Sequence, residues 1–117
     1  MILVNEAGEK TTFPGSEYTH RPTHIFYHEG VAVGSFVTYD EASIWSVCIK
    51  PEYQGLGFGT QMMREIVELY GKTQNLILHV YKNNETAIHI YEKVGFFITG
   101  EYFETAWTME RMADNIG

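Results

Sequence analysis

Three glycines at alternating positions, Gly55, Gly57 and Gly59, lie between an apolar run that stops at a proline and an amphipathic run that begins at Thr60. Glycine adopts a positive φ without strain and lets the backbone approach a ligand closely. The amphipathic run predicts a helix directly behind the turn, and the free N–H groups and dipole of a helix N-terminus attract anions. The spacing therefore indicates a cradle for a phosphate or another anion.

Two well-known phosphate-binding loops do not fit this turn. A P-loop ends in Gly-Lys-Ser/Thr, whereas Gly59 is followed by Thr60 and Gln61. The dinucleotide fingerprint is G-x-G-x-x-G, whereas the spacing here is G-x-G-x-G. What remains is Gln-x-x-Gly-x-Gly, formed by Gln54, Gly57 and Gly59, which resembles the loop that binds the acetyl-CoA pyrophosphate in GNAT N-acetyltransferases. Taken alone, the pattern fits a plain strand-to-helix turn equally well.

A second motif strengthens the resemblance. Leu78-His79-Val80 is followed at fixed spacing by Asn84, Ala87, Tyr91 and Gly95-Phe96. This run is similar to the second GNAT signature, V-x-x-x-N-x-x-A-x-x-x-Y-x-x-x-G-F, and it follows the first motif in the family's order. The chain is identified as a member of the GNAT family, with residues 24–112 as the family core. The resemblance implies an α+β fold with a central, mostly antiparallel sheet and two main helices.

The resemblance also implies a role for individual residues. Those expected to hold acetyl-CoA are the strand residues Val47 and Ile49, which would pair with the pantetheine arm, the pyrophosphate-loop residues Gln54, Gly55, Gly57, Gly59 and Thr60, and Asn84, which would lie against the CoA arm. Tyr91 occupies the family's general-acid position. Its phenol, with an ordinary pKa near 10, would protonate the departing CoA thiolate. Helical periodicity alone would make Tyr91 a core aromatic residue.

An amine acceptor must lose a proton before it attacks the thioester. A lysine-like amine with a pKa of about 10.4 is neutral in only roughly one molecule in 2,500 at pH 7. Asp40, Glu41 and His79 are candidate bases, and the sequence does not choose among them. Cys48 is expected to be an ordinary strand residue, because direct attack by the amine needs no covalent intermediate.

Composition and charge restrict the partners. The formal net charge is −7, from 8 basic and 15 acidic residues, which argues against nucleic acid or an anionic membrane and is compatible with a cationic amine. The histidines show no paired-ligand spacing, so no metal is expected. The single cysteine and the lack of a signal peptide or long apolar run indicate a cytoplasmic protein.

The 117 residues are expected to form one domain. The patterns predict strands at residues 1–5, 24–27, 31–39, 44–49, 76–81, 96–99 and 106–112. They also predict helices at 60–70, capped by Thr60, and at 85–94, capped within Asn83-Asn84. Residues 1–23 form a shortened, irregular N-terminal segment, since no helical stripe occurs where GNAT domains usually have two helices. Either the acceptor groove is open or a second subunit covers it, and we expect a homodimer.

Two functions of different classes remain open at this point. The first is an enzyme that moves an acetyl group from acetyl-CoA directly to a primary amine on a small molecule, a lysine or an N-terminus. The second is a non-catalytic module that binds CoA or acetyl-CoA and regulates a partner. Tyr91 favours the first, while the shortened acceptor wall and the unassigned base favour the second. The acceptor itself is not named by either motif, because variable loops build its pocket.

Overall fold

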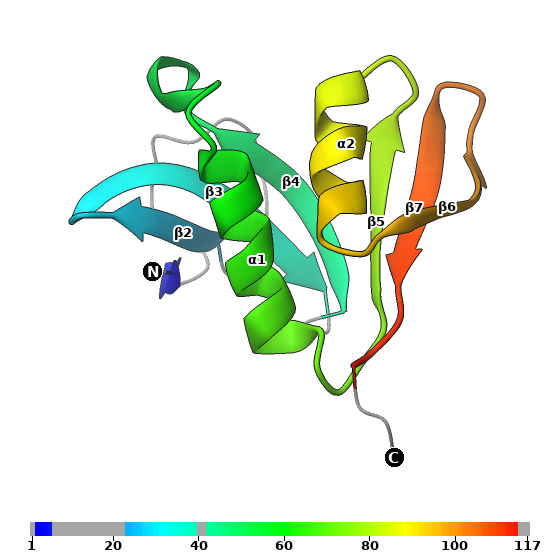
Figure 1. Cartoon of the computed structure of the whole chain (residues 1–117), viewed down its shortest axis with the longest axis horizontal. Helices are drawn as coiled ribbons and strands as arrows, with labels where there is room; N and C mark the ends of the chain where they lie inside the picture. The colour runs from blue at the N-terminus through cyan, green and yellow to red at the C-terminus, as the bar shows by residue number, and fades with distance from the viewer. Residues whose placement is uncertain (1, 6–22, 40–41, 115–117) are drawn as a thin grey trace.

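The computed structural model describes residues 2–5, 23–39 and 42–114. Its elements, in chain order, are β1 (Ile2–Asn5), β2 (Thr23–His28), β3 (Val31–Tyr39), β4 (Ser43–Ile49), the short 3-10 helix η2 (Pro51–Tyr53), α1 (Phe58–Tyr70), β5 (Leu76–Tyr81), α2 (Glu85–Lys93), β6 (Phe97–Tyr102) and β7 (Ala106–Arg111) (Figure 1). This order confirms the predicted succession of strands and helices. Residues 6–22 of the irregular segment and the candidate bases Asp40 and Glu41 lie outside the described residues.

The strands form one seven-stranded sheet in the order β1-β2-β3-β4-β5-β7-β6. Neighbouring strands are antiparallel except β4 and β5, which are parallel and pair only at Ser43 with Ile77 and Ile44 with Leu78. Beyond Ile44 the two strands separate, while β5 stays paired with β7 along its whole length. The two facing edges of β4 and β5 therefore have backbone groups that this sheet does not pair, at the centre of the fold.

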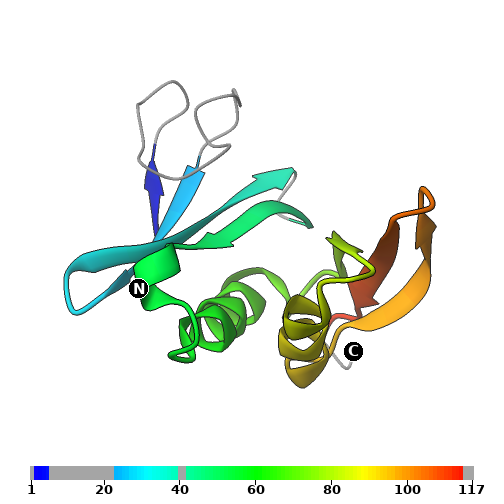
Figure 2. The ribbon, with the colours of Figure 1, turned by 90° about the horizontal axis from the view of Figure 1, so that it is seen from above.

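Both helices cover the same face of the sheet (Figure 2). The inward stripe of α1 contributes Met62, Met63 and Ile66 to the core, where they are fully buried. Strand residues such as Phe36 and Leu78 meet them from the sheet. The core thus fixes α1 and α2 against the two halves of the sheet on either side of the point where β4 and β5 diverge.

The prediction that Thr60 caps the first helix is wrong. The helix begins at Phe58, and its N-cap is Gly57 with φ of 88°. The backbone turns into the helix two residues earlier because glycine takes up the left-handed conformation that this turn requires. Asn84 is confirmed as the N-cap of α2, where its Oδ1 accepts a hydrogen bond of 3.2 Å from the Ala87 N–H.

The end of the chain differs more from expectation. Strand β6 runs to Tyr102 instead of ending at Thr99, and its pairing with β7 continues through Glu101 opposite Trp107. The turn is made by Phe103, whose φ is 56°, together with the residues that follow it. Glu101, which the predicted boundary left outside the strand, is exposed on this edge strand, where charge is tolerated, while Glu104 lies in the turn.

A single arginine ties the C-terminal ends of both helices to β7. Arg111 donates from Nε to the Val94 carbonyl at 2.7 Å and from Nη1 to the Gly71 carbonyl at 3.3 Å. A cation at this position also interacts favourably with the negative ends of two helix dipoles. The contact helps to explain Gly95, which has a φ of 104° and whose Cβ, if present, would lie 3.0 Å from the Arg111 Nε.

Candidate active site

A bulge interrupts β4 just beyond its last contact with β5. Val37 pairs with Trp45 and Ser35 pairs with Cys48, so two residues of β4, Ser46 and Val47, lie opposite one residue of β3. Ser46 takes a φ of 54°, an uncommon conformation for a residue other than glycine. Residues three apart in a regular strand point to opposite faces, but the extra residue reverses the alternation. Val47 therefore packs against the core on the same side as Ile44.

The bulge also decides where the backbone of β4 points. The Lys50 N–H donates to the Val33 carbonyl at 2.9 Å, toward β3. Because backbone groups of successive strand residues point to opposite edges, those of Val47 and Ile49 point toward the gap that β5 leaves. The Ile49 carbonyl accepts a 3.0 Å hydrogen bond from Gln54 Nε2 on that side. An extended ligand lying in the gap can therefore pair with β4 as a strand would.

The three glycines of the loop are required for two different structural reasons. Gly55 and Gly57 have φ values of 78° and 88°, and a Cβ at either would meet nothing within 4 Å. Gly59 instead allows close packing of the helices, since its Cβ would lie 3.1 Å from Ile90 Cδ1. The first two therefore shape the backbone at an open surface, and the third brings α1 close to α2.

The N–H groups of the first turn of α1 face this open surface. The first intrahelical bond there is donated by the Gln61 N–H to the Gly57 carbonyl at 3.1 Å. The N–H groups of Phe58, Gly59 and Thr60 precede it and are the ones that a helix leaves without an intrahelical acceptor. With the helix dipole, these N–H groups are the donors that the predicted anion cradle requires.

A cavity of about 460 Å³, here called the loop cavity, lies in front of these groups. It brings together all the residues that the sequence assigned to acetyl-CoA, namely Val47, Ile49, Gln54, Gly55, Gly57, Gly59, Thr60 and Asn84. Sequence reasoning missed further lining residues, among them Tyr53, Met63, Thr86 and Ile90. On the α2 side, the motif residues Asn84, Ala87 and Tyr91 all line this cavity, whereas Thr86 and Ile90 carried no signal in the sequence.

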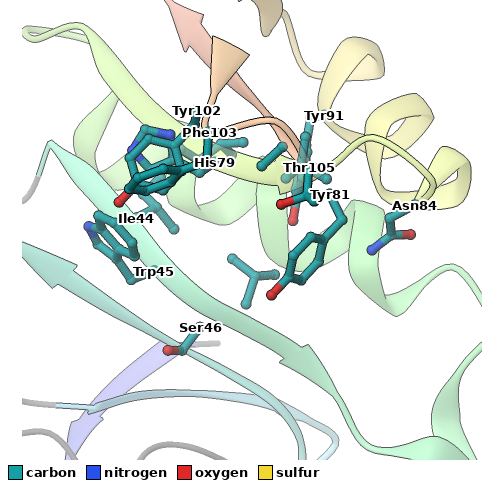
Figure 3. Close-up of a pocket in the computed structure, with 14 residues that line it drawn as sticks. Ile44, Trp45, Ser46, His79, Tyr81, Asn84, Tyr91, Tyr102, Phe103 and Thr105 are labelled. Carbon is teal, nitrogen blue, oxygen red and sulfur yellow. The ribbon is translucent and has the colours of Figure 1, made fainter.

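A second cavity, of about 530 Å³, lies where β4 and β5 diverge and is here called the splay cavity (Figure 3). Its walls come from β4, from β5 and from the β6–β7 hairpin. Val47, Asn84 and Tyr91 line both cavities, so the two meet at these three residues. A molecule in one cavity can therefore approach a molecule in the other at Tyr91.

Tyr91 lies on α2 with only 7 % of its surface exposed. Burial raises the pKa of its phenol to about 12, because the charged form would lose its hydration. The phenol is therefore protonated at neutral pH and is able to donate a hydrogen bond. Periodicity alone would assign Tyr91 to the core; the structure places it both in the core and on the wall of each cavity.

Of the candidate bases, His79 is the one that the described residues include. It lines the splay cavity, and its Nδ1 lies 3.1 Å from Thr108 Oγ1. Burial lowers the pKa of His79 from its ordinary value, so the imidazole is neutral at pH 7 and can accept a proton. Among the described residues no cluster of three or more His, Cys, Asp or Glu side chains could hold a metal ion.

Comparison with known protein families identifies the family of this chain. The profile described as the Acetyltransferase (GNAT) family matches residues 6–96. The chain therefore belongs to the GNAT acetyltransferase family. Its fold is the one expected of a member, and residues of both sequence motifs line the same cavity.

Individual relatives differ in how much of the chain they share. The spermine/spermidine N(1)-acetyltransferase of Bacillus subtilis (strain 168) is 33% identical over 97 residues, which are 70% of this chain and 62% of that protein. The spermidine N(1)-acetyltransferase of Escherichia coli (strain K12) is 44% identical over 61 residues, 49% of this chain and 32% of that protein. The matched part thus spans about three fifths of the first relative and a third of the second.

Solved structures give the same fold. A GNAT family acetyltransferase from Elizabethkingia anophelis, with acetyl-CoA bound, superimposes with a TM-score of 0.72 at 15% identity, covering 96% of this chain and 97% of that one. The ribosomal-protein-S18-alanine N-acetyltransferase from Escherichia coli gives a TM-score of 0.67 at 17% identity over 81% of this chain and 70% of that one. At these identities the likeness establishes the fold.

Proposed function

We propose that this chain is an N-acetyltransferase that moves the acetyl group of acetyl-CoA directly to a primary amine. The observation that carries the proposal is the meeting of two cavities at Val47, Asn84 and Tyr91. One cavity has an anion cradle and a strand edge suited to CoA, and the other opens where an acceptor can enter. Membership of the GNAT family and the named activities of its relatives support the same reaction.

In this proposal the loop cavity takes CoA. The N–H groups that follow Gly57 hold the pyrophosphate, and the backbone of Val47 and Ile49 pairs with the pantetheine arm. Gln54 stabilises the loop, since its side chain bonds to the end of β4 through the Ile49 carbonyl. Asn84 fixes the start of α2 beside the arm through its capping bond to the Ala87 N–H. The chain has only 8 lysine and arginine residues against 15 acidic ones, so backbone amides carry most of the phosphate binding.

The amine nitrogen attacks the thioester carbonyl carbon, the C–S bond breaks, and the CoA sulfur leaves with the bonding electron pair. Tyr91 donates a hydrogen bond to that sulfur. With the Tyr91 pKa raised to about 12 and a thiol pKa of about 8.5, complete proton transfer from the phenol is uphill by roughly 3.5 pKa units, about 5 kcal/mol. Tyr91 therefore stabilises the leaving thiolate chiefly as a donor, and the proton released by the amine restores the thiol.

His79 is the proposed acceptor of the amine proton. It faces the splay cavity, it is neutral because burial lowers its pKa, and Thr108 holds its Nδ1 side. The other nitrogen, Nε2, is then the one available to the amine or to an intervening water. A neutral base is required, because an acceptor amine enters mostly as ammonium at pH 7.

The test is release of CoA thiol from acetyl-CoA in the presence of a panel of primary amines, with the acetylated product identified by mass spectrometry. The proposal predicts release that requires both the protein and an amine. Tight acetyl-CoA binding without turnover on any amine would instead favour the regulatory module.

We further propose that the protein is a cytoplasmic homodimer. Strand β6 lies at the edge of the sheet, and its Phe97 and Ile98 are 46% and 42% exposed, an apolar surface that a second copy would cover. The single cysteine, Cys48, is free and fits a reducing compartment. Among the described residues no helix is long and apolar enough to span a membrane. Light scattering at micromolar concentration tests the dimer, and a mass of one chain contradicts it.

A further inference from the structure

Three aromatic side chains form one continuous surface along the splay cavity, here called the aromatic wall and defined as Trp45, His79 and Tyr102. His79 and Tyr102 are stacked, with ring centroids 3.7 Å apart and an angle of 18° between the planes. Trp45 lies at 5.1 Å from His79 and 6.3 Å from Tyr102. Figure 3 shows the three rings gathered at one side of the cavity, away from Asn84.

Hydrogen bonds fix the orientation of this wall. The Trp45 indole N–H donates to Ser43 Oγ at 2.8 Å, and the His79 ring is held by Thr108. Phe103 supports Tyr102 from the hairpin turn in an edge-to-face contact, with centroids 4.7 Å apart. The wall is therefore a preformed surface, and a ligand group that lies on it loses little extra conformational freedom in the protein.

The spacing of the rings decides what the wall can bind. An aromatic cage holds a cation between ring faces, but these rings already contact one another and leave no room for an ammonium group among them. Of the described residues, none that lines the splay cavity carries a carboxylate that could neutralise a second positive charge. The wall instead presents apolar ring surface, which suits another flat or bulky apolar group.

We propose that the acceptor of the splay cavity is a primary amine that carries an aromatic or large apolar group close to its nitrogen, and that Trp45 and Tyr102 select it. The inference rests on the proposed acetyl transfer, because it assigns the acceptor of that reaction. It separates this chain from the polyamine substrates in the names of its Bacillus subtilis and Escherichia coli relatives. The amine reaches toward Tyr91, where the two cavities meet, and the apolar group lies on the wall.

The same chemistry occurs in a free arylalkylamine and in a peptide whose first residue is phenylalanine. The experiment therefore compares four acceptors in the thiol-release assay: 2-phenylethylamine, a short peptide with an N-terminal phenylalanine, ethylamine and spermidine. We expect kcat/KM at least tenfold higher for one of the two aromatic acceptors than for ethylamine and spermidine, and the better of the two identifies the source. Equal or better use of spermidine overturns the proposal and leaves acetyl transfer intact.

A pair of variants links the preference to the wall. Trp45→Ala should lower the ratio of kcat/KM for the aromatic acceptor to that for ethylamine about tenfold. As a control, Leu69→Ala removes an exposed apolar side chain of α1 that lines neither cavity, and the ratio should stay unchanged. An unchanged ratio in Trp45→Ala overturns the proposal.

If no amine is acetylated, the proposed function fails, and binding still tests the wall. Calorimetry with the CoA-saturated protein should then show 2-phenylethylamine binding at least tenfold more tightly than ethylamine and spermidine. Absence of that preference overturns the assignment of the wall.

Discussion

Replacing Gly57 by alanine tests the anion cradle, with Gly30→Ala as a matched control. Both glycines have a positive φ, 88° and 80°, and a Cβ at either meets nothing within 4 Å. An alanine held in the left-handed region costs about 1–2 kcal/mol at each site. Since a domain of this size is usually stable by about 5–15 kcal/mol, both variants should fold with a similar loss in the free energy of unfolding.

Their effects on CoA binding should differ. Gly57 lines the loop cavity and precedes the N–H groups proposed to bind the pyrophosphate, whereas Gly30 lies in the β2–β3 turn and lines neither cavity. A relaxation of φ at residue 57 out of the left-handed region displaces at least one of these donors. Loss of one hydrogen bond to a charged group, about 1.5–3 kcal/mol, raises the Kd for CoA roughly 10- to 150-fold.

The assay is titration of CoA by calorimetry, alongside urea unfolding of both variants without ligand. We expect both variants to lose a similar amount of stability. The Kd for CoA should rise in Gly57→Ala and stay unchanged in Gly30→Ala. Wild-type affinity in Gly57→Ala, or equal weakening in Gly30→Ala, would refute the assignment of this turn to the pyrophosphate.

Three further substitutions test other parts of the site. Tyr91→Phe should lower kcat about 100-fold and leave CoA affinity nearly intact, because it removes one donor at the leaving sulfur; unchanged turnover would contradict the role of the phenol. His79→Gln should abolish the acid limb of the kcat profile against pH. In the wild type, activity falls as His79 becomes protonated, and because burial lowers its pKa the limb should lie below about 6.5, the ordinary value; persistence of that limb in the variant would exclude His79 as the base. Arg111→Met keeps the aliphatic stem but loses the bonds to Val94 and Gly71, so urea unfolding should show a loss of about 2–4 kcal/mol; a loss below 1 kcal/mol would show that the arginine does not stabilise the helix ends.

The parts of the site that lie close together in the chain could be predicted from the sequence. Gly55, Gly57 and the helix behind them form a local unit, and Asn84 caps its helix through a residue three positions away. The cap at Thr60 was wrong because a hydroxyl residue is the stronger cap in general, while the left-handed glycine before Phe58 decided the boundary.

The parts that depend on strand register could not be predicted. The bulge at Ser46 is a shift in the register between β3 and β4. It depends on how the two strands pair, and the residue pattern of β4 alone does not predict it. The aromatic wall likewise joins Trp45, His79 and Tyr102 from three strands, and their meeting requires the pairing of β5, β7 and β6 as well as the gap beside β4. His79 could be named as a candidate base, but its stacking partner could not.

Direct transfer at the meeting point of the two cavities is tested most directly by following one reaction with two readouts. During turnover with acetyl-CoA and an amine, the amounts of released thiol and acetylated amine should be equal, and the mass of the intact protein should not change. Thiol release without acetylated amine, or an acetyl group found on the protein at Cys48, would contradict direct attack by the amine.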